Sequence, residues 1–207
     1  MDYTFTLAGI ALANILGAMS PGPAFFLVGR AAASHSRANG LATGMGVAAA
    51  ATLWATAATF GVAVLMTRFT AVYGAIQLAG GVYLIWLGLM SWRHSSDPDD
   101  GSPASTPSRL SRAALAGFSL SLTNPKIVIF FSSIFVALFP VHTPLWVRLT
   151  ALGIVALQET LWYTLVACVL SHSKVQAAYR RIKDKVERLM GAVFIALGAR
   201  IVALARI

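Results

Sequence analysis

Charged residues are scarce in this sequence, and so is cysteine. Only 11% of the 207 residues are charged and 57% are hydrophobic, whereas soluble globular domains carry about 25% charged residues. Cys168 is the single cysteine, which excludes an intramolecular disulfide and a paired-thiol electron relay. Segments of about ten residues with alternating hydrophobicity, typical of transmembrane barrels, are missing. With a mean hydropathy of +0.74, the composition predicts an all-α integral membrane protein.

Several functional signatures are missing as well. The sequence shows no cluster of metal ligands, no glycine-rich nucleotide loop and no nucleophile–base pair, so we expect neither an enzyme nor a bound cofactor or metal. The net charge of +9 could attract nucleic acid. The basic residues, however, lie between apolar segments, where orientation signals belong. We therefore expect a lipid bilayer and small solutes as partners, and no nucleic acid.

Six apolar stretches are long enough, or nearly so, to cross a bilayer, which takes about 20 residues. They are Phe5–Gly29, Leu41–Met66, Val72–Trp92, Ala113–Phe139, Trp146–Leu170 and Leu189–Leu204. The polar residues at 94–112, rich in Ser, Pro and Asp, predict a cytoplasmic linker. This linker separates a first three-helix repeat at 1–93 from a second at 113–207, in a single transmembrane domain.

Lysine and arginine predict the orientation, because loops with an excess of them stay in the cytoplasm. Eleven follow the first, third and fifth stretches: Arg30, Arg37, Arg93, Arg109, Arg112, Lys174, Arg180, Arg181, Lys183, Lys185 and Arg188. The three on the opposite side are Arg68, Arg148 and Arg206. We expect a multi-pass protein of the cytoplasmic (inner) membrane, with both termini outside. The basic stretch Ser171–Arg188 predicts a short amphipathic helix on the cytoplasmic surface.

The two halves resemble each other in sequence. The segment "GVYLIWLG" at 81–88 matches "GAVFIALG" at 191–198, an offset of 110, and "LGAMSPGP" at 16–23 matches "LSLTNPKI" at 120–127, an offset of 104. Two matches in the same order and at similar offsets indicate a duplication. Three spans per half would insert the second half upside down. Such inverted repeats recur in transporters, with the binding site near the bilayer midplane between the repeats.

Prolines interrupt the first and fourth apolar stretches. Pro21, Gly22 and Pro23 lie inside the first, and Asn124 and Pro125 lie at the matching place in the fourth. Proline removes an amide donor and displaces the carbonyl four residues earlier, so both helices should be broken or kinked there. In lipid, the freed backbone groups must find partners inside the protein or in a water-filled cavity. An ordinary proline kink is the alternative.

The freed backbone groups suggest a binding site. A helix that continued through the prolines would leave the carbonyls of Gly17, Met19 and Ser121 without an amide partner. Proline also suits the first position of a new helix. A half-helix that begins near Pro23 or Pro125 would direct free amides and the positive end of its dipole into the protein, where an anion could bind.

Two charges lie deep in apolar stretches. Lys126 is in the middle of Ala113–Phe139, and Glu159 lies near the middle of Trp146–Leu170. A charge at the bilayer centre costs about 2.5–3.5 kcal/mol on insertion scales, so such residues normally face a cavity or a partner. One interpretation is an ion pair that joins two helices. The other is a transport site, in which Lys126 binds a substrate carboxylate and Glu159 takes a proton or a substrate ammonium.

The second apolar stretch begins with closely spaced small residues. Gly40, Gly44 and Gly46 precede four alanines at 48–51, a pattern that favours close helix packing. Bare backbone along a substrate path is the alternative. The packing could join helices within one chain or between two, so a homo-oligomer stays open.

The motifs together resemble the LysE/RhtB family of amino-acid exporters. The resemblance rests on "GAMSPGPAFFLVGRAAASHSRANGLATGMGVAAAA", "LAGGVYLIWLGL", "GFSLSLTNPKIVIFF" and "RLMGAVFIALGARI". It covers nearly the whole chain except residues 94–108 and the detail of the fifth stretch. The family's motif positions correspond here to Gly17, Pro21, Gly22, Pro23, Asn124, Pro125 and Lys126.

The resemblance implies a secondary exporter of amino acids or similar small solutes, driven by an ion gradient, for which we expect protons. One departure bears on the cargo. Where many relatives have glycine followed by an acid in the second span, this chain has Ala50 and Ala51, which favours neutral amino acids over lysine or arginine. The role expected of Glu159 rests on the membrane argument alone. A passive small-solute channel or a non-transporting membrane scaffold is the alternative.

Overall fold

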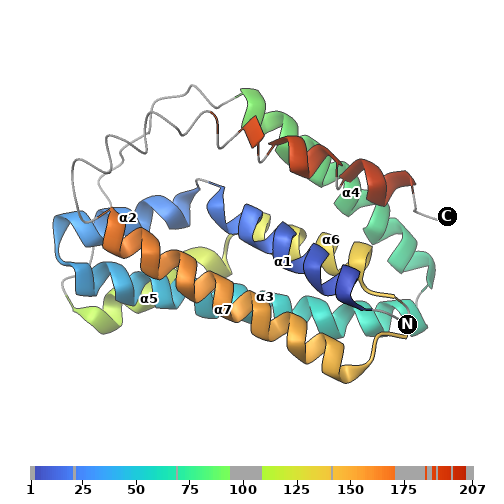
Figure 1. Cartoon of the computed structure of the whole chain (residues 1–207), viewed down its shortest axis with the longest axis horizontal. Coiled ribbons are helices and arrows are strands. Elements are labelled where there is room, and N and C mark those ends of the chain that lie inside the picture. Colours follow the sequence, from blue (N-terminus) through green and yellow to red (C-terminus); the bar gives the residue numbers. More distant parts are fainter. Residues whose placement is uncertain are drawn as a thin grey trace.

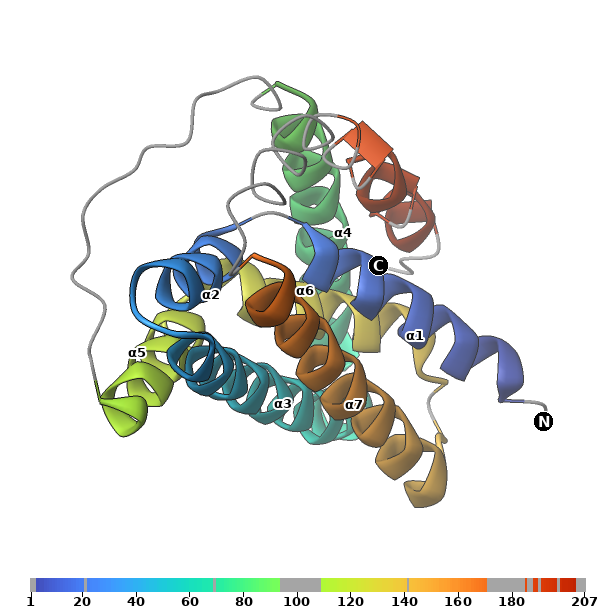
Figure 2. The same ribbon diagram turned by 60° about the vertical axis from the view of Figure 1, so that its left-hand side comes forward.

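The computed structural model shows a helical bundle (Figures 1 and 2). It describes residues 3–20, 22–68, 70–93, 109–140, 142–170, 185, 188–189, 191–196 and 198–203, and no strand occurs among them. The helices are α1 (Thr4–Met19), α2 (Pro23–Ser34), α3 (Arg37–Arg68), α4 (Thr70–Arg93), α5 (Leu110–Leu122), α6 (Pro125–Leu138) and α7 (Leu145–Val169). A further apolar helix, Gly191–Ala203, follows. Pro21, most of the linker and most of Ser171–Arg188 lie outside the described residues.

The helices include two that are long and apolar enough to cross a membrane unbroken, within α3 and α7. The pairs α1–α2 and α5–α6 each pass the same test when taken together, and bend by 58° and 60° where the two helices meet. The helix breaks predicted at the prolines are therefore confirmed. In α4 the apolar part, Leu78–Met90, is shorter, as is Gly191–Ala203. The described residues thus provide up to four spans, and the full set of six stays a prediction.

Both breaks follow from the same local arrangement. Pro23 and Pro125 each begin a helix, where the amide that proline lacks would have no partner anyway. The preceding helices end in a turn: Ser20 N donates to Gly17 O at 3.2 Å, and Asn124 N donates to Ser121 O at 3.3 Å. A helix that continued through the prolines would leave the carbonyls of Gly17 and Ser121 without a partner. In the turns, each of these carbonyls accepts a backbone amide instead.

Helix α3 lies at the centre of the bundle. It packs against α2, α5, α6 and α7, while α7 also packs against α1 and α2. A methyl group added at Gly46 would overlap the Ala114 carbonyl of α5, and one added at Gly117 of α5 would overlap the Thr43 carbonyl of α3. These helices therefore touch backbone to backbone, which confirms the close packing predicted for the glycines of the second apolar stretch.

Helix α4 and the Gly191–Ala203 helix lie side by side (Figures 1 and 2). A methyl group added at Gly81 would lie 3.0 Å from the Gly198 carbonyl oxygen, and one at Gly88 would lie 2.5 Å from the Gly191 carbonyl oxygen. Of the two α4 glycines, the one that comes first in the chain, Gly81, contacts the later glycine of the other helix, and Gly88 contacts the earlier one. The two helices therefore run antiparallel and touch at glycine.

Burial recurs at the offsets found in the sequence. Every described residue at 81–89 has the same degree of burial as its counterpart at 191–199, an offset of 110. At the offset of 104, both α3 and α7 bury every fourth residue over four turns. The positions are Thr43, Val47, Ala51, Ala55 and Thr59 in α3, and Val147, Ala151, Val155, Glu159 and Tyr163 in α7.

Candidate functional site

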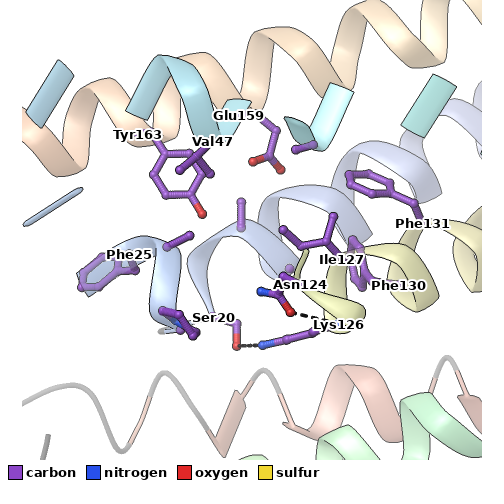
Figure 3. Close-up of a pocket in the computed structure, with 16 residues that line it drawn as sticks. Ser20, Phe25, Val47, Asn124, Lys126, Ile127, Phe130, Phe131, Glu159 and Tyr163 are labelled. Atoms are coloured by element: carbon purple, nitrogen blue, oxygen red, sulfur yellow. Dashed lines mark hydrogen bonds between the residues drawn. The ribbon is translucent and has the colours of Figure 1, made fainter. Parts of the chain in front are cut away.

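A pocket of about 60 Å³ lies where the two broken helices meet (Figure 3). This volume has room for a few water molecules, since one needs roughly 10–15 Å³ by such a measure. Helices α1, α2, α3, α6 and α7, with the breaks between them, supply its walls. The lining residues are Gly17, Ala18, Ser20, Gly22, Pro23, Ala24, Phe25, Val47, Ala51, Asn124, Lys126, Ile127, Phe130, Phe131, Glu159 and Tyr163.

One side of the pocket is formed by the N-termini of α2 and α6. Asn124 caps α6, because its side-chain oxygen accepts from Lys126 N at 3.0 Å. The Lys126 side chain reaches across to the first break, where Nζ donates to Ser20 Oγ at 3.0 Å (Figure 3). A lysine charge and two helix N-termini, which carry partial positive charge, therefore share this side.

The opposite side carries an acid and a phenol from α7. Glu159 and Tyr163 lie one turn apart and are 5% and 7% exposed. Figure 3 shows both side chains directed into the pocket, across from Ser20 and Lys126. The structure thus brings the two predicted charges to one pocket but on opposite sides, with the Lys126 ammonium directed to Ser20 rather than to Glu159.

A line of polar side chains joins α1 to α7 beside Glu159. Gln158 Nε2 donates to Ala11 O at 3.1 Å, and Asn14 Nδ2 donates to Gln158 Oε1 at 3.1 Å. Asn14 is 1% exposed, and its Oδ1 has no hydrogen-bond partner in the part of the chain that the structure describes.

The remaining walls are apolar. Val47 and Ala51 of α3, Phe25 of α2, and Phe130 and Phe131 of α6 line the pocket. These walls separate the cationic side from Glu159. The pocket thus presents a cationic side and an acidic side with apolar walls between them.

Six of the eight residues predicted for the site line this pocket: Gly17, Gly22, Pro23, Asn124, Lys126 and Glu159. Pro125 begins α6 next to the pocket but is not among the lining residues, and Pro21 lies outside the described residues. Sequence reasoning missed Ser20 and Tyr163. A signal existed for Ser20, which directly precedes Pro21. Tyr163 lies one turn after Glu159 and could have been placed over a substrate, but an aromatic residue in a span is more often in the core or at the membrane interface.

In the described segments, no three His, Cys, Asp or Glu side chains come together. Comparison with known proteins then decides the family. The family model described as "LysE type translocator" matches residues 15–204. The chain belongs to this family. It is accordingly a multi-pass membrane transporter and not an enzyme.

Several relatives of this LysE type translocator carry names that state what they export. A "Threonine efflux protein" of Salmonella typhi is 28% identical over 93% of this chain and 95% of its own length. A "Leucine efflux protein" of Klebsiella pneumoniae is 27% identical over 89% of this chain and 88% of its own. A "Homoserine/homoserine lactone efflux protein" of Salmonella typhi is 31% identical over 45% of each chain. No solved structure matches the chain significantly.

Proposed function

We propose that this translocator is a secondary active exporter of neutral amino acids across the cytoplasmic membrane, coupled to the proton gradient. The observation that carries the proposal is the pocket, in which Lys126 and two helix N-termini face Glu159 across apolar walls. Relatives named for the efflux of threonine, leucine and homoserine support a single amino acid as cargo.

The substrate carboxylate is proposed to bind on the side of Lys126. The N-terminus of α2 has no side-chain cap and would add amide donors there, because the first amides of a helix have no partner within it. The first amides of α6, by contrast, already bond Asn124, so α6 adds the positive end of its dipole. Gly22 has open space around its Cα, with only the Ser20 carbonyl within 4 Å of an added methyl group. A carboxylate could therefore approach this backbone closely. The substrate would displace the Lys126 ammonium from Ser20 and offer it a stronger, charged acceptor.

The substrate ammonium is proposed to bind on the opposite side, at Glu159 and the Tyr163 hydroxyl. Ala51 lies in the wall next to this side. It stands where the family resemblance places an acid in many relatives, which leaves Glu159 as the one carboxylate among the described lining residues. A second positive charge on the substrate, as in lysine, would then lack a partner, and a neutral side chain would rest against Val47, Ala51 and Phe131.

The transport movement is proposed to be a rocking of two inverted repeats, 1–93 and 113–207, joined by the cytoplasmic linker 94–112. Two observations support this: the matching turns at the two breaks and the antiparallel glycine contacts between α4 and the Gly191–Ala203 helix. A pseudo-two-fold axis in the membrane plane relates helices of opposite direction in this manner. The pocket between the two broken helices would open alternately to each side.

Transport in proteoliposomes tests the function. Purified protein is reconstituted, a pH gradient is imposed, and accumulation of labelled L-threonine, L-leucine, L-homoserine and L-lysine is measured. We expect accumulation of at least one neutral amino acid and none of L-lysine. Lys126→Ala should abolish transport, and Glu159→Gln should abolish accumulation driven by the pH gradient.

The same experiment separates the alternatives. A passive channel would dissipate a solute gradient but never build one, and a membrane scaffold would do neither. Unchanged flux in both Lys126→Ala and Glu159→Gln would contradict the roles given to these residues. Accumulation of L-lysine alone would contradict the preference for neutral cargo.

A further inference from the structure

Leu122 is the last residue of α5, and the second helix break deprives its carbonyl of a backbone donor. In an unbroken helix this carbonyl would accept from the amide four residues later, which belongs to Lys126. That amide donates to the Asn124 side chain at 3.0 Å instead. No other backbone amide of the described residues donates to Leu122 O. A carbonyl without a donor is costly inside a membrane span, so a donor from elsewhere is needed.

Trp54 of α3 supplies this donor. Its Nε1 donates to Leu122 O at 3.1 Å, and an indole nitrogen can only donate. The ring packs against the apolar cluster that includes Ala51 and Phe131. Both of these residues line the pocket, whereas Trp54 does not. Trp54 therefore supports the break from outside the pocket.

The Leu122 carbonyl and the Lys126 amide would bond each other in a continuous helix, and each has a different partner here. Asn124 holds the amide and Trp54 holds the carbonyl. Without the indole, the carbonyl could regain a donor by taking the Lys126 amide back. The two helices would then join through an ordinary proline kink, and the bend of 60° between α5 and α6 would decrease.

We propose that Trp54 is a positioning residue for Lys126. Because the indole occupies Leu122 O, the Lys126 amide stays on Asn124 and α6 keeps its angle to α5. From this backbone the Lys126 side chain reaches Ser20 across the pocket. The proposal rests on the proposed transport function, in which Lys126 binds the substrate carboxylate.

The first break has no such support among the described residues. At the offset of 104, Gln158 corresponds to Trp54 and Ala18 to Leu122. Gln158 Nε2, however, donates to Ala11 O, in the middle of α1. The start of α2 also lacks a side-chain cap. Support by an indole and by a cap thus occurs together at the break from which Lys126 extends.

NMR spectroscopy of the purified protein, labelled with nitrogen-15 at its tryptophan indoles, tests the proposal without any substrate. The chain has five tryptophans, and Trp54→Phe identifies the indole signal of Trp54. In Asn124→Ala the Lys126 amide loses its acceptor and competes for Leu122 O, so the Trp54 indole proton should move upfield as its bond weakens. Asn124→Ser keeps a cap and should leave the signal in place.

Trp92 provides the matched control. Its Nε1 also donates to a backbone carbonyl, that of Arg188 at 2.6 Å, outside the pocket and both breaks. Its indole signal should not move in Asn124→Ala. An unmoved Trp54 signal in that variant, or equal movement of both signals, overturns the competition between the indole and the Lys126 amide.

The NMR measurement does not require Trp54→Phe to fold. Replacement of the other tryptophans by phenylalanine, one at a time, assigns the Trp54 signal by elimination. These residues are Trp86, Trp92, Trp146 and Trp162.

Uptake into proteoliposomes measures the effect on Lys126. Trp54→Phe keeps an aromatic ring but loses the N–H. For the neutral amino acid that the wild type accumulates, it should raise KM about two- to tenfold, the effect of losing one hydrogen bond of typical strength, with little change in maximal rate. Trp92→Phe should leave KM unchanged.

A merely structural role of Trp54 would give a different result. Loss of folded protein would lower the maximal rate at an unchanged KM. An unchanged KM in folded Trp54→Phe, or an equal rise in Trp92→Phe, overturns the proposal. If the wild type accumulated no amino acid, the proposed transport function would fail, while the indole signals would still decide whether Trp54 holds the break.

Discussion

At the scale of single residues, the pocket depends on how closely Phe130 approaches α1. The ring packs edge-on against Phe131 and Phe194, with centroids 5.4 Å and 5.8 Å away. Its tip occupies the space that a side chain at Gly17 would fill. Gly17 thus allows an aromatic wall to close against the end of α1, directly beside the first helix break.

We predict that Gly17→Ala destabilises the protein and disturbs the pocket. The added methyl group would overlap the Phe130 ring, and overpacking of this kind typically costs about 1–3 kcal/mol. Thermal denaturation of the purified protein in detergent measures the effect, and the double variant with Phe130→Leu should recover much of the loss.

Gly153→Ala is the matched control for this substitution. Gly153 is also in a helix, but nothing lies within 4 Å of an added methyl group there. Alanine is a better helix former than glycine by up to about 1 kcal/mol, so this variant should be as stable as the wild type or more so. Equal melting temperatures for Gly17→Ala and Gly153→Ala would contradict the proposed packing.

Some residues of the site could be predicted because they differ in polarity from the apolar sequence around them. Lys126 and Glu159 stand out, because a charge in an apolar run requires a partner or a cavity. Tyr163, Val47 and Ala51 do not stand out. Helices α3 and α7 are apolar on most sides, so periodicity does not say which face meets the pocket and which meets lipid.

At the scale of helices, the two breaks share a geometry but differ in their caps. At the second break the Asn124 side chain accepts from Lys126 N, whereas at the first break Gly22 provides no side-chain cap. The cap orders the start of α6 and thereby the backbone from which Lys126 extends. The start of α2 has open space around Gly22. At the start of α6, the Lys126 amide is held in place by its hydrogen bond to Asn124.

We predict that Asn124→Ala destabilises the start of α6 by about 1 kcal/mol, the usual cost of a lost N-cap. Asn124→Ser should restore most of this stability, because serine also caps well. Denaturant unfolding monitored by circular dichroism gives the difference in free energy. If alanine and serine variants were equally stable, the cap would have no structural role.

The positions of these breaks could be predicted from sequence because their cause is local. Proline removes a backbone donor wherever it stands, so Pro23 and Pro125 give the same result in any fold. The pairing of α4 with the Gly191–Ala203 helix could not be predicted in this manner. Gly81 meets Gly198 and Gly88 meets Gly191 only because the whole bundle brings the two helices together. The offset of 110 relates Gly81 to Gly191 and Gly88 to Gly198, so it indicates similarity and not contact.

At the scale of the whole molecule, the proposed inverted repeats predict on which side of the membrane the linker and the termini lie. An odd number of spans per half puts the linker 94–112 and the two termini on opposite sides of the membrane. The excess of Lys and Arg beside the first, third and fifth apolar stretches predicts that the linker lies in the cytoplasm.

Cysteine labelling tests this topology. Cys168 is the only cysteine of the chain, so Cys168→Ser provides a background without thiols. We expect Asp2→Cys to react with a membrane-impermeant maleimide in intact cells, and Ser102→Cys to react only after permeabilisation. The opposite pattern would reverse the orientation, and labelling of both in intact cells would exclude an odd number of spans between them.

The glycine contacts between α4 and the Gly191–Ala203 helix have the form of an isologous interface. Gly81 meets Gly198 and Gly88 meets Gly191, and the offset of 110 converts each pair into the other. In symmetric dimers, the same patch on both subunits pairs with itself in this way. Such an interface needs no covalent connection between its partners. With the proposed three-helix repeats, this is the contact that two copies of one repeat, inserted in opposite orientations, would make with each other.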